Sequence, residues 1–145
     1  MDNKEYNEKA INDVYKNAHI ALQSISDILP SVDDEGLKVE LKEQYEGYER
    51  VIGEISTFMA ENNITPKDVN PLKKAMLWSS IKMKTMFDNS KNQIAEMMIK
   101  GNTMGVNKMT KHIRNYDGGD SNIRMLAKKM LDTEEEHIRE MKAFL

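Results

Sequence analysis

Apolar residues recur at helical spacing along most of this chain, and that periodicity limits its fold more than any other feature. Four segments carry the pattern, at about residues 3–29, 34–62, 71–116 and 121–144. No segment alternates apolar and polar residues as a half-buried strand does. The pattern therefore predicts an all-α fold, a four-helix bundle formed by a single domain over residues 1–145.

Proline, aspartate and glycine mark the expected helix ends. Pro30 ends the first helix, and Asp33 or Asp34 is the expected N-cap of the second. The stretch "YDGGDSN" predicts a loop, after which Asp120 or Ser121 caps the fourth helix. Because these connections are short, they favour antiparallel neighbours, and we expect up-down-up-down topology.

The third helical segment is unusually long. It runs from Pro71 to Tyr116 without a proline, which is roughly 69 Å of helix against roughly 43 Å for the second segment. Gly101 and Gly105 interrupt it, and each glycine costs about 1 kcal/mol relative to alanine. We expect a kink or break between these glycines, with a shorter helix beyond them. The alternative is one continuous helix that overhangs the bundle.

Composition excludes several kinds of protein. The 145 residues contain no cysteine, which excludes disulfides and thiolate metal sites. We see no signal peptide at the polar N-terminus and no apolar run long enough to span a bilayer, so a cytoplasmic protein with no membrane partner is expected. The net charge of −3 gives no general attraction to nucleic acid.

Charge is unevenly distributed between the two middle segments. Residues 33–62 hold nine acidic and three basic residues, whereas residues 71–116 hold nine basic and two acidic ones. Complementary surfaces of neighbouring helices explain this difference, and an acidic partner for the third helix is the alternative. The basic segment lacks the interleaved aromatic residues that stack on bases, so we expect no nucleic-acid partner.

Methionine is concentrated in the third segment. Met76, Met83, Met97 and Met104 keep a seven-residue phase, which is typical of core positions. The alternatives are an adaptable binding groove, since methionine side chains are flexible, and a Cu(I) site built from thioethers.

One motif could carry chemistry. In the last helix, Glu134 and His137 fall on the apolar stripe with Met130 and Met141, one helical turn apart. Four bundle helices with such a Glu-x-x-His resemble the ferritin-like superfamily. The stretches "IALQSISDILPSVDDEGLKVELKEQYEGYERVI" and "NQIAEMMIKGNTMGVNKMTK" are also similar to small uncharacterised bacterial proteins placed near that superfamily.

The resemblance implies a dimetal centre of iron or manganese with six protein ligands, of which this sequence supplies only two. Ferritin-like centres use a glutamate from each of two helices and Glu-x-x-His from each of the other two. Here the second stripe carries Gln44, Tyr45 and Tyr48 at the inward positions, and the first carries no acid. Glu134 and His137 are thus weak metal candidates. The alternatives are a buried hydrogen-bonded pair, with Tyr45, Tyr48, Ser79 or Ser80 as partners, two exposed groups that reach out to water, and an acid–base pair.

No catalytic or cofactor-binding residue can be named from the sequence. Serine nucleophiles, phosphate-cradling glycine loops and paired inward carboxylates are missing as recognisable patterns. We therefore expect a structural or interaction protein without a cofactor, with a metal-binding or oxidoreductase-type bundle as the alternative. We expect a homo-oligomer, specifically a homodimer that buries the surface around Met97 to Met109. An unknown protein partner is the alternative to self-association.

Overall fold

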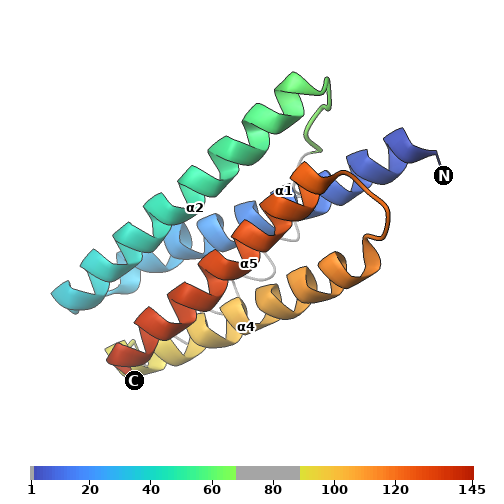
Figure 1. Cartoon of the computed structure of the whole chain (residues 1–145). Coiled ribbons are helices and arrows are strands. Elements are labelled where there is room, and N and C mark those ends of the chain that lie inside the picture. Colours follow the sequence, from blue (N-terminus) through green and yellow to red (C-terminus); the bar gives the residue numbers. More distant parts are fainter. Residues whose placement is uncertain (1, 68–88) are drawn as a thin grey trace.

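Four long α-helices pack side by side in this computed structural model, which describes residues 2–67 and 89–145. The long helices are α1 (Asn3–Ile28), α2 (Glu35–Glu61), α4 (Lys91–Asn115) and α5 (Ser121–Met141) (Figure 1). Short 3₁₀ turns follow α1 at Leu29–Ser31 (η1) and α5 at Lys142–Phe144 (η2). These two ranges contain no strand, and none of their helices is long and apolar enough to cross a membrane. The all-α, four-helix class expected from the sequence is confirmed.

Aspartate side chains begin the helices as expected. Asp34 accepts a 2.9 Å hydrogen bond from the backbone N–H of Leu37 at the start of α2. Asp120 accepts a 2.7 Å bond from the N–H of Asn122 at the start of α5. Each bond satisfies a backbone donor that has no partner within the helix, so short polar side chains set these ends.

The order of helix directions differs from the expected one. Tyr48 of α2 hydrogen-bonds Asn102 of α4, while Asn89, just before α4, hydrogen-bonds Asp33, just before α2. Helices α2 and α4 therefore run parallel, and the topology is up-down-down-up rather than up-down-up-down (Figure 1). The end of α2 and the start of α4 lie at opposite ends of the bundle. The expectation failed because the short connections constrain only the pairs α1–α2 and α4–α5, and they leave the direction of α4 relative to α2 open.

Helix α4 passes both glycines without interruption. It begins at Lys91, after an extended Ser90, and continues as one α-helix to Asn115. The expected break between Gly101 and Gly105 was therefore wrong, and the expected start at Pro71 lies outside the described residues. The physical reason is local: Gly105 is buried against a side chain of α5, and this close packing, rather than a bend, accounts for the missing side chain.

The methionines of α4 do not keep the phase that the sequence suggested. Met98 and Met109 are buried, but Met104 is 58% exposed and Met97 is only half-buried. The seven-residue phase of Met97 and Met104 as core positions was wrong, because the buried stripe of α4 lies one residue later. Met76 and Met83 lie outside the described residues.

The apolar core runs the length of the four helices. Its largest fully buried members come from every helix and include Ile11, Ile25, Leu37, Leu41, Ile55, Ile94, Ile123 and Met130. Full burial of such a side chain is worth roughly 1.5–3 kcal/mol. This core fixes the relative positions of the polar side chains that interrupt it near mid-bundle.

Candidate functional site

A layer of polar side chains crosses the apolar core near the middle of the bundle. We call it the polar layer, and all its members are at most 8% exposed: Asn17, Gln44, Tyr48, Asn102, Glu134 and His137. Every long helix contributes at least one of them. Buried polar groups are costly unless they are paired, so the partners of each member decide its chemistry.

Glu134 is held in place by two neighbouring helices. Its Oε1 accepts a 2.7 Å hydrogen bond from Asn17 Nδ2 of α1. On the other side its carboxyl group lies against Gly105 of α4, where an added Cβ atom would stand 2.1 Å from Oε2. No real Cβ atom comes so close to an oxygen. The glycine therefore makes the space that the Glu134 carboxyl group occupies.

His137 is accommodated by α2 in a similar way. Its ring packs edge-on against the ring of Tyr48, with 4.5 Å between the ring centroids. A Cβ atom at Gly47 would stand 3.2 Å from His137 Nε2, closer than most real contacts of this kind. His137 Nδ1 is buried and has no hydrogen-bond partner among the described residues.

The remaining members form amide and hydroxyl contacts. Gln44 Nε2 donates to Glu40 Oε1 at 3.1 Å and to the backbone oxygen of His137 at 3.4 Å. Tyr48 donates its hydroxyl hydrogen to Asn102 Oδ1 at 3.2 Å. Tyr48 thus contacts His137 through its ring but hydrogen-bonds to an amide rather than to Glu134.

Sequence reasoning missed the partner of Glu134. Among the expected partners, Tyr48 donates its hydrogen bond to Asn102 instead, and Ser79 and Ser80 lie outside the described residues. Asn17 was overlooked because only acids were sought on the first helix. The signal was present, since Asn17 stands three residues after Val14 and four before Ala21, on the buried stripe. An amide at such a position needs a buried partner.

Burial makes the polar layer uncharged at neutral pH. Desolvation raises the pKa of Glu134 to about 8, although the Asn17 hydrogen bond and the positive charge of Lys108 favour its ionised form. Desolvation also lowers the pKa of His137 to about 4, against the pull of Glu40 and Glu136. Both side chains are thus neutral near pH 7, one as a carboxylic acid and the other as an imidazole.

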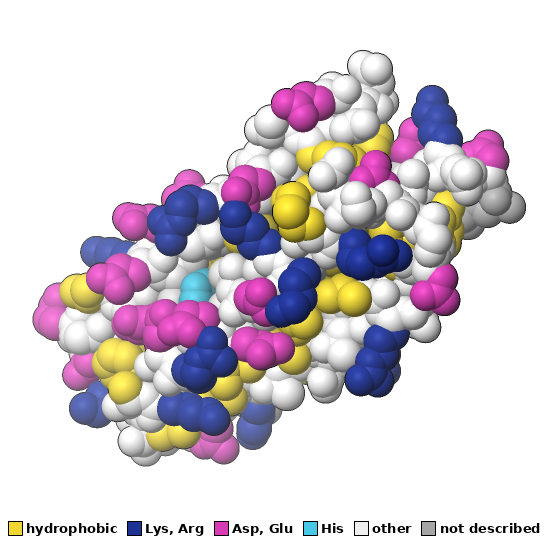
Figure 2. Space-filling view, viewed as in Figure 1, with side chains coloured by type: hydrophobic (Ala, Val, Ile, Leu, Met, Phe, Trp, Pro, Cys, Tyr) yellow, Lys and Arg dark blue, Asp and Glu magenta, His cyan; other side chains and the backbone are white. Residues whose placement is uncertain are grey.

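Glu134 and His137 face different sides of the bundle. Glu134 lines a cavity of about 150 Å³ between α1 and α4, together with Met97, Met98 and Met104. His137 lines a groove of about 490 Å³ between α2 and α5 with Glu43, Glu136 and Glu140. We call the latter the acidic groove. Figure 2 shows acidic side chains bordering a histidine surface on this face.

Glu140 shows how crowded the acidic groove is. A side-chain hydrogen bond with Glu40 raises the pKa of Glu140 to about 8, and partial burial and the nearby charges of Glu40 and Glu136 act in the same direction. His137 thus lies beside these crowded carboxyl groups, whereas Glu134, one helical turn away, lies in different surroundings.

The described donors do not fit a dimetal centre. Such a centre takes glutamates and a second Glu-x-x-His, whereas the polar layer has the amides Asn17, Gln44 and Asn102, and amide oxygens carry no charge to balance two cations. Among residues 2–67 and 89–145, no three His, Cys, Asp or Glu side chains are grouped to hold a metal ion. Binding of a single ion by Glu134 or His137 stays a prediction.

Comparison with known proteins identifies the fold. No protein-family model matches the chain, and no curated protein matches it either. Among solved structures it is similar to a dodecameric thioferritin, the bacterioferritin-related protein from Bacteroides fragilis. The TM-score is 0.70 at 15% sequence identity, over 99% of this chain and 86% of that one. The chain therefore has a ferritin-like fold.

Proposed function

We propose that this chain is a non-catalytic ferritin-like bundle that acts as a structural or interaction protein and does not use a dimetal centre. The observation that carries the proposal is the composition of the polar layer, which contains amides from α1, α2 and α4 but only one carboxyl group. An amide both donates and accepts hydrogen bonds, whereas metal ligation calls for deprotonated acceptors. The layer is thus suited to neutral hydrogen bonding.

The charge balance supports the same proposal. Two divalent ions carry four positive charges, and the polar layer offers Glu134 as its one carboxyl group. Ionising Glu134 at neutral pH is itself unfavourable because its pKa is about 8. The layer also lacks a second carboxyl group for general acid–base exchange with Glu134. These features favour a polar layer that determines how the helices pack, rather than one that carries out a reaction.

Self-association is the form of interaction that we propose. The similar thioferritin from Bacteroides fragilis is described as dodecameric. On this chain, large apolar side chains are exposed at Val39, Met104, Met125 and Leu145. We place a homodimer contact at Met97 and Met104 on the outer side of α4, since Met98 and Met109 are already buried inside the bundle.

Two measurements test the proposal separately. Light scattering at high micromolar concentration should show a dimer or larger assembly, and Met104→Ser should shift it toward monomer. Met125→Ser, equally exposed on α5, is the matched control. A monomer at all concentrations contradicts self-association.

Independently, millimolar Mn(II) or anaerobic Fe(II) should leave the melting temperature unchanged, since a ligand that binds the folded state must raise it. A concentration-dependent rise contradicts metal independence.

A further inference from the structure

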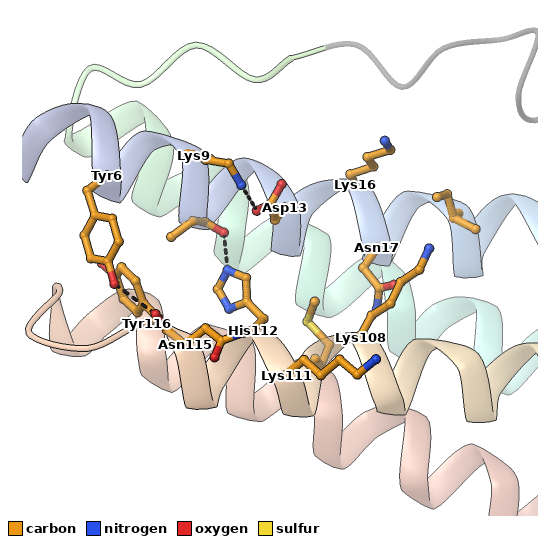
Figure 3. Close-up of a pocket in the computed structure, with 13 residues that line it drawn as sticks. Tyr6, Lys9, Asp13, Lys16, Asn17, Lys108, Lys111, His112, Asn115 and Tyr116 are labelled. Carbon is orange, nitrogen blue, oxygen red and sulfur yellow. Dashed lines mark hydrogen bonds and ion pairs between the residues drawn. The ribbon is translucent and has the colours of Figure 1, made fainter. Parts of the chain in front are cut away.

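A groove between α1 and α4 collects positive charge around an apolar floor. Its volume is about 440 Å³, which lies in the range of small-molecule sites. Lys9 and Lys16 of α1 and Lys108 and Lys111 of α4 line it, and the Lys16 side chain points away from α4 (Figure 3). We call it the basic groove. It adjoins the cavity at Glu134, because Asn17, Ile20 and Lys108 line both.

Three of the four lysines lack a carboxylate partner among the residues that the structure describes. Lys9 pairs with Asp13 at 3.1 Å on the same helix. No carboxylate in the described ranges lies within 4.0 Å of the ammonium group of Lys16, Lys108 or Lys111. Lys9 and Asp13 cancel and Lys16 points away, so among the described residues Lys108 and Lys111 leave two uncompensated positive charges at the groove. A concave surface concentrates their field.

Hydrogen bonds hold the apolar end of the groove in a defined shape. Tyr6 and Tyr116 stack with 5.0 Å between their ring centroids, and the Tyr6 hydroxyl donates to the backbone oxygen of Asn115 at 3.2 Å. His112 Nε2 lies 2.9 Å from the backbone oxygen of Ala10, where it is placed to donate. These contacts tie α1 to α4, so the groove is formed before any ligand arrives. A preformed site loses less conformational freedom on binding.

We propose that the basic groove binds a small soluble phosphate monoester or diphosphate that carries a compact planar apolar group. The anionic end lies between Lys108 and Lys111, and the planar part lies against the half-buried ring of Tyr6, since Tyr116 and Met109 are themselves buried. Lysine ammonium groups suit phosphate as mobile point charges, and aromatic rings suit a flat apolar partner. This inference goes beyond the proposed self-association and does not depend on it.

Three simple compounds separate the contributions of the phosphate and of the planar group. Isothermal titration calorimetry with 1-naphthyl phosphate, inorganic pyrophosphate and uncharged 1-naphthol should give binding of the first, weaker binding of the second and none of the third. Lys108→Gln should weaken the binding of 1-naphthyl phosphate about tenfold, since it removes a charge-assisted hydrogen bond. Lys100→Gln is the matched control, because Lys100 is on the same helix but pairs with Glu96 outside the groove.

The outcomes decide the proposal. Binding that Lys108→Gln and Lys111→Gln weaken, and that Lys100→Gln leaves unchanged, supports it. Equal weakening by all three variants shows a general effect of net charge and overturns it, as does the absence of binding to both phosphate probes. Tighter binding of a poly-glutamate peptide than of naphthyl phosphate also overturns it, in favour of an acidic polypeptide partner. Light scattering in the same samples reports self-association independently.

Discussion

Glu134 and His137 belong to one motif, yet the two sides of the bundle treat them differently. Glu134 faces α1 and α4, where it meets an amide, a glycine and the positive charge of Lys108. His137, on the same helix, faces α2 and lines the groove between α2 and α5, where acidic side chains gather. The spacing puts both on one stripe of α5, but the helices packed against that stripe decide what each side chain can do. A shared metal site needs convergence, and here the two surroundings diverge.

Alanine at Gly105 should have the largest effect, because it removes the space on the Glu134 side. The new Cβ atom would overlap the carboxyl end of the Glu134 side chain, which would have to shift and give up its Asn17 hydrogen bond, so the change should cost about 3 kcal/mol of unfolding free energy. Chemical denaturation measures the loss. Adding Glu134→Ala should recover much of it, and a double variant as unstable as Gly105→Ala alone would show that the clash lies elsewhere. Gly47→Ala, beside His137, should cost less.

Removal of the titrating group at Glu134 should change the pH dependence of stability. The folded-state pKa of about 8 exceeds the unfolded value of 4.5, so the folded state binds more protons between these values and stability falls as pH rises through that window. Glu134→Gln should remove about 2–4 kcal/mol of that decline. Denaturation from pH 5 to pH 9 measures it. Parallel profiles for wild type and variant would contradict a neutral Glu134.

His137 should change the pH dependence of stability in the opposite direction. Its folded-state pKa of about 4 lies below the unfolded 6.5, so its contribution to stability is present above pH 6.5 and is lost as pH falls toward 4. In wild type the Glu134 trend offsets this loss between about pH 4.5 and 6.5. In the Glu134→Gln background the loss of stability at acid pH should therefore be visible, at about 2 kcal/mol, and adding His137→Gln should abolish it. Denaturation midpoints from pH 4 to 7 in both backgrounds give the comparison.

The smallest effect should come from the other glycine of α4. Gly101 is exposed and has no heavy atom within 4 Å of an added Cβ atom. Gly101→Ala should therefore stabilise the protein by about 0.5–1 kcal/mol through its helix propensity. A thermal melt checks the sign. Destabilisation here would show that α4 needs a flexible glycine at this position, as the sequence alone had suggested.

Much of the architecture follows from periodicity, whereas the site depends on packing between helices. The stripes predict the four long helices, and Asp34 and Asp120 predict two of their starts. The roles of Gly101 and Gly105 could not be distinguished, since a glycine that bends a helix and one that admits a neighbour's carboxyl group look alike in sequence. The direction of α4 was missed because it depends on the path after α2 rather than on any residue of α4.

The polar layer was only partly foreseen for a related reason. Glu134, His137, Gln44 and Tyr48 were recognised as inward polar positions, but a search restricted to metal ligands passed over Asn17 and Asn102. Their amides have meaning only in relation to the carboxyl and hydroxyl groups that they meet across the bundle.

The ionisation of Glu134 tests the central claim, a neutral amide-lined layer at mid-bundle, most directly. Carbon-13 NMR of the side-chain carboxyl groups, with the Glu134 signal assigned by its loss in Glu134→Gln, would follow its titration in the folded protein. The account predicts a midpoint near pH 8. A midpoint near the ordinary 4.5 would mean that Glu134 is a carboxylate at neutral pH, available to cations, and would contradict it.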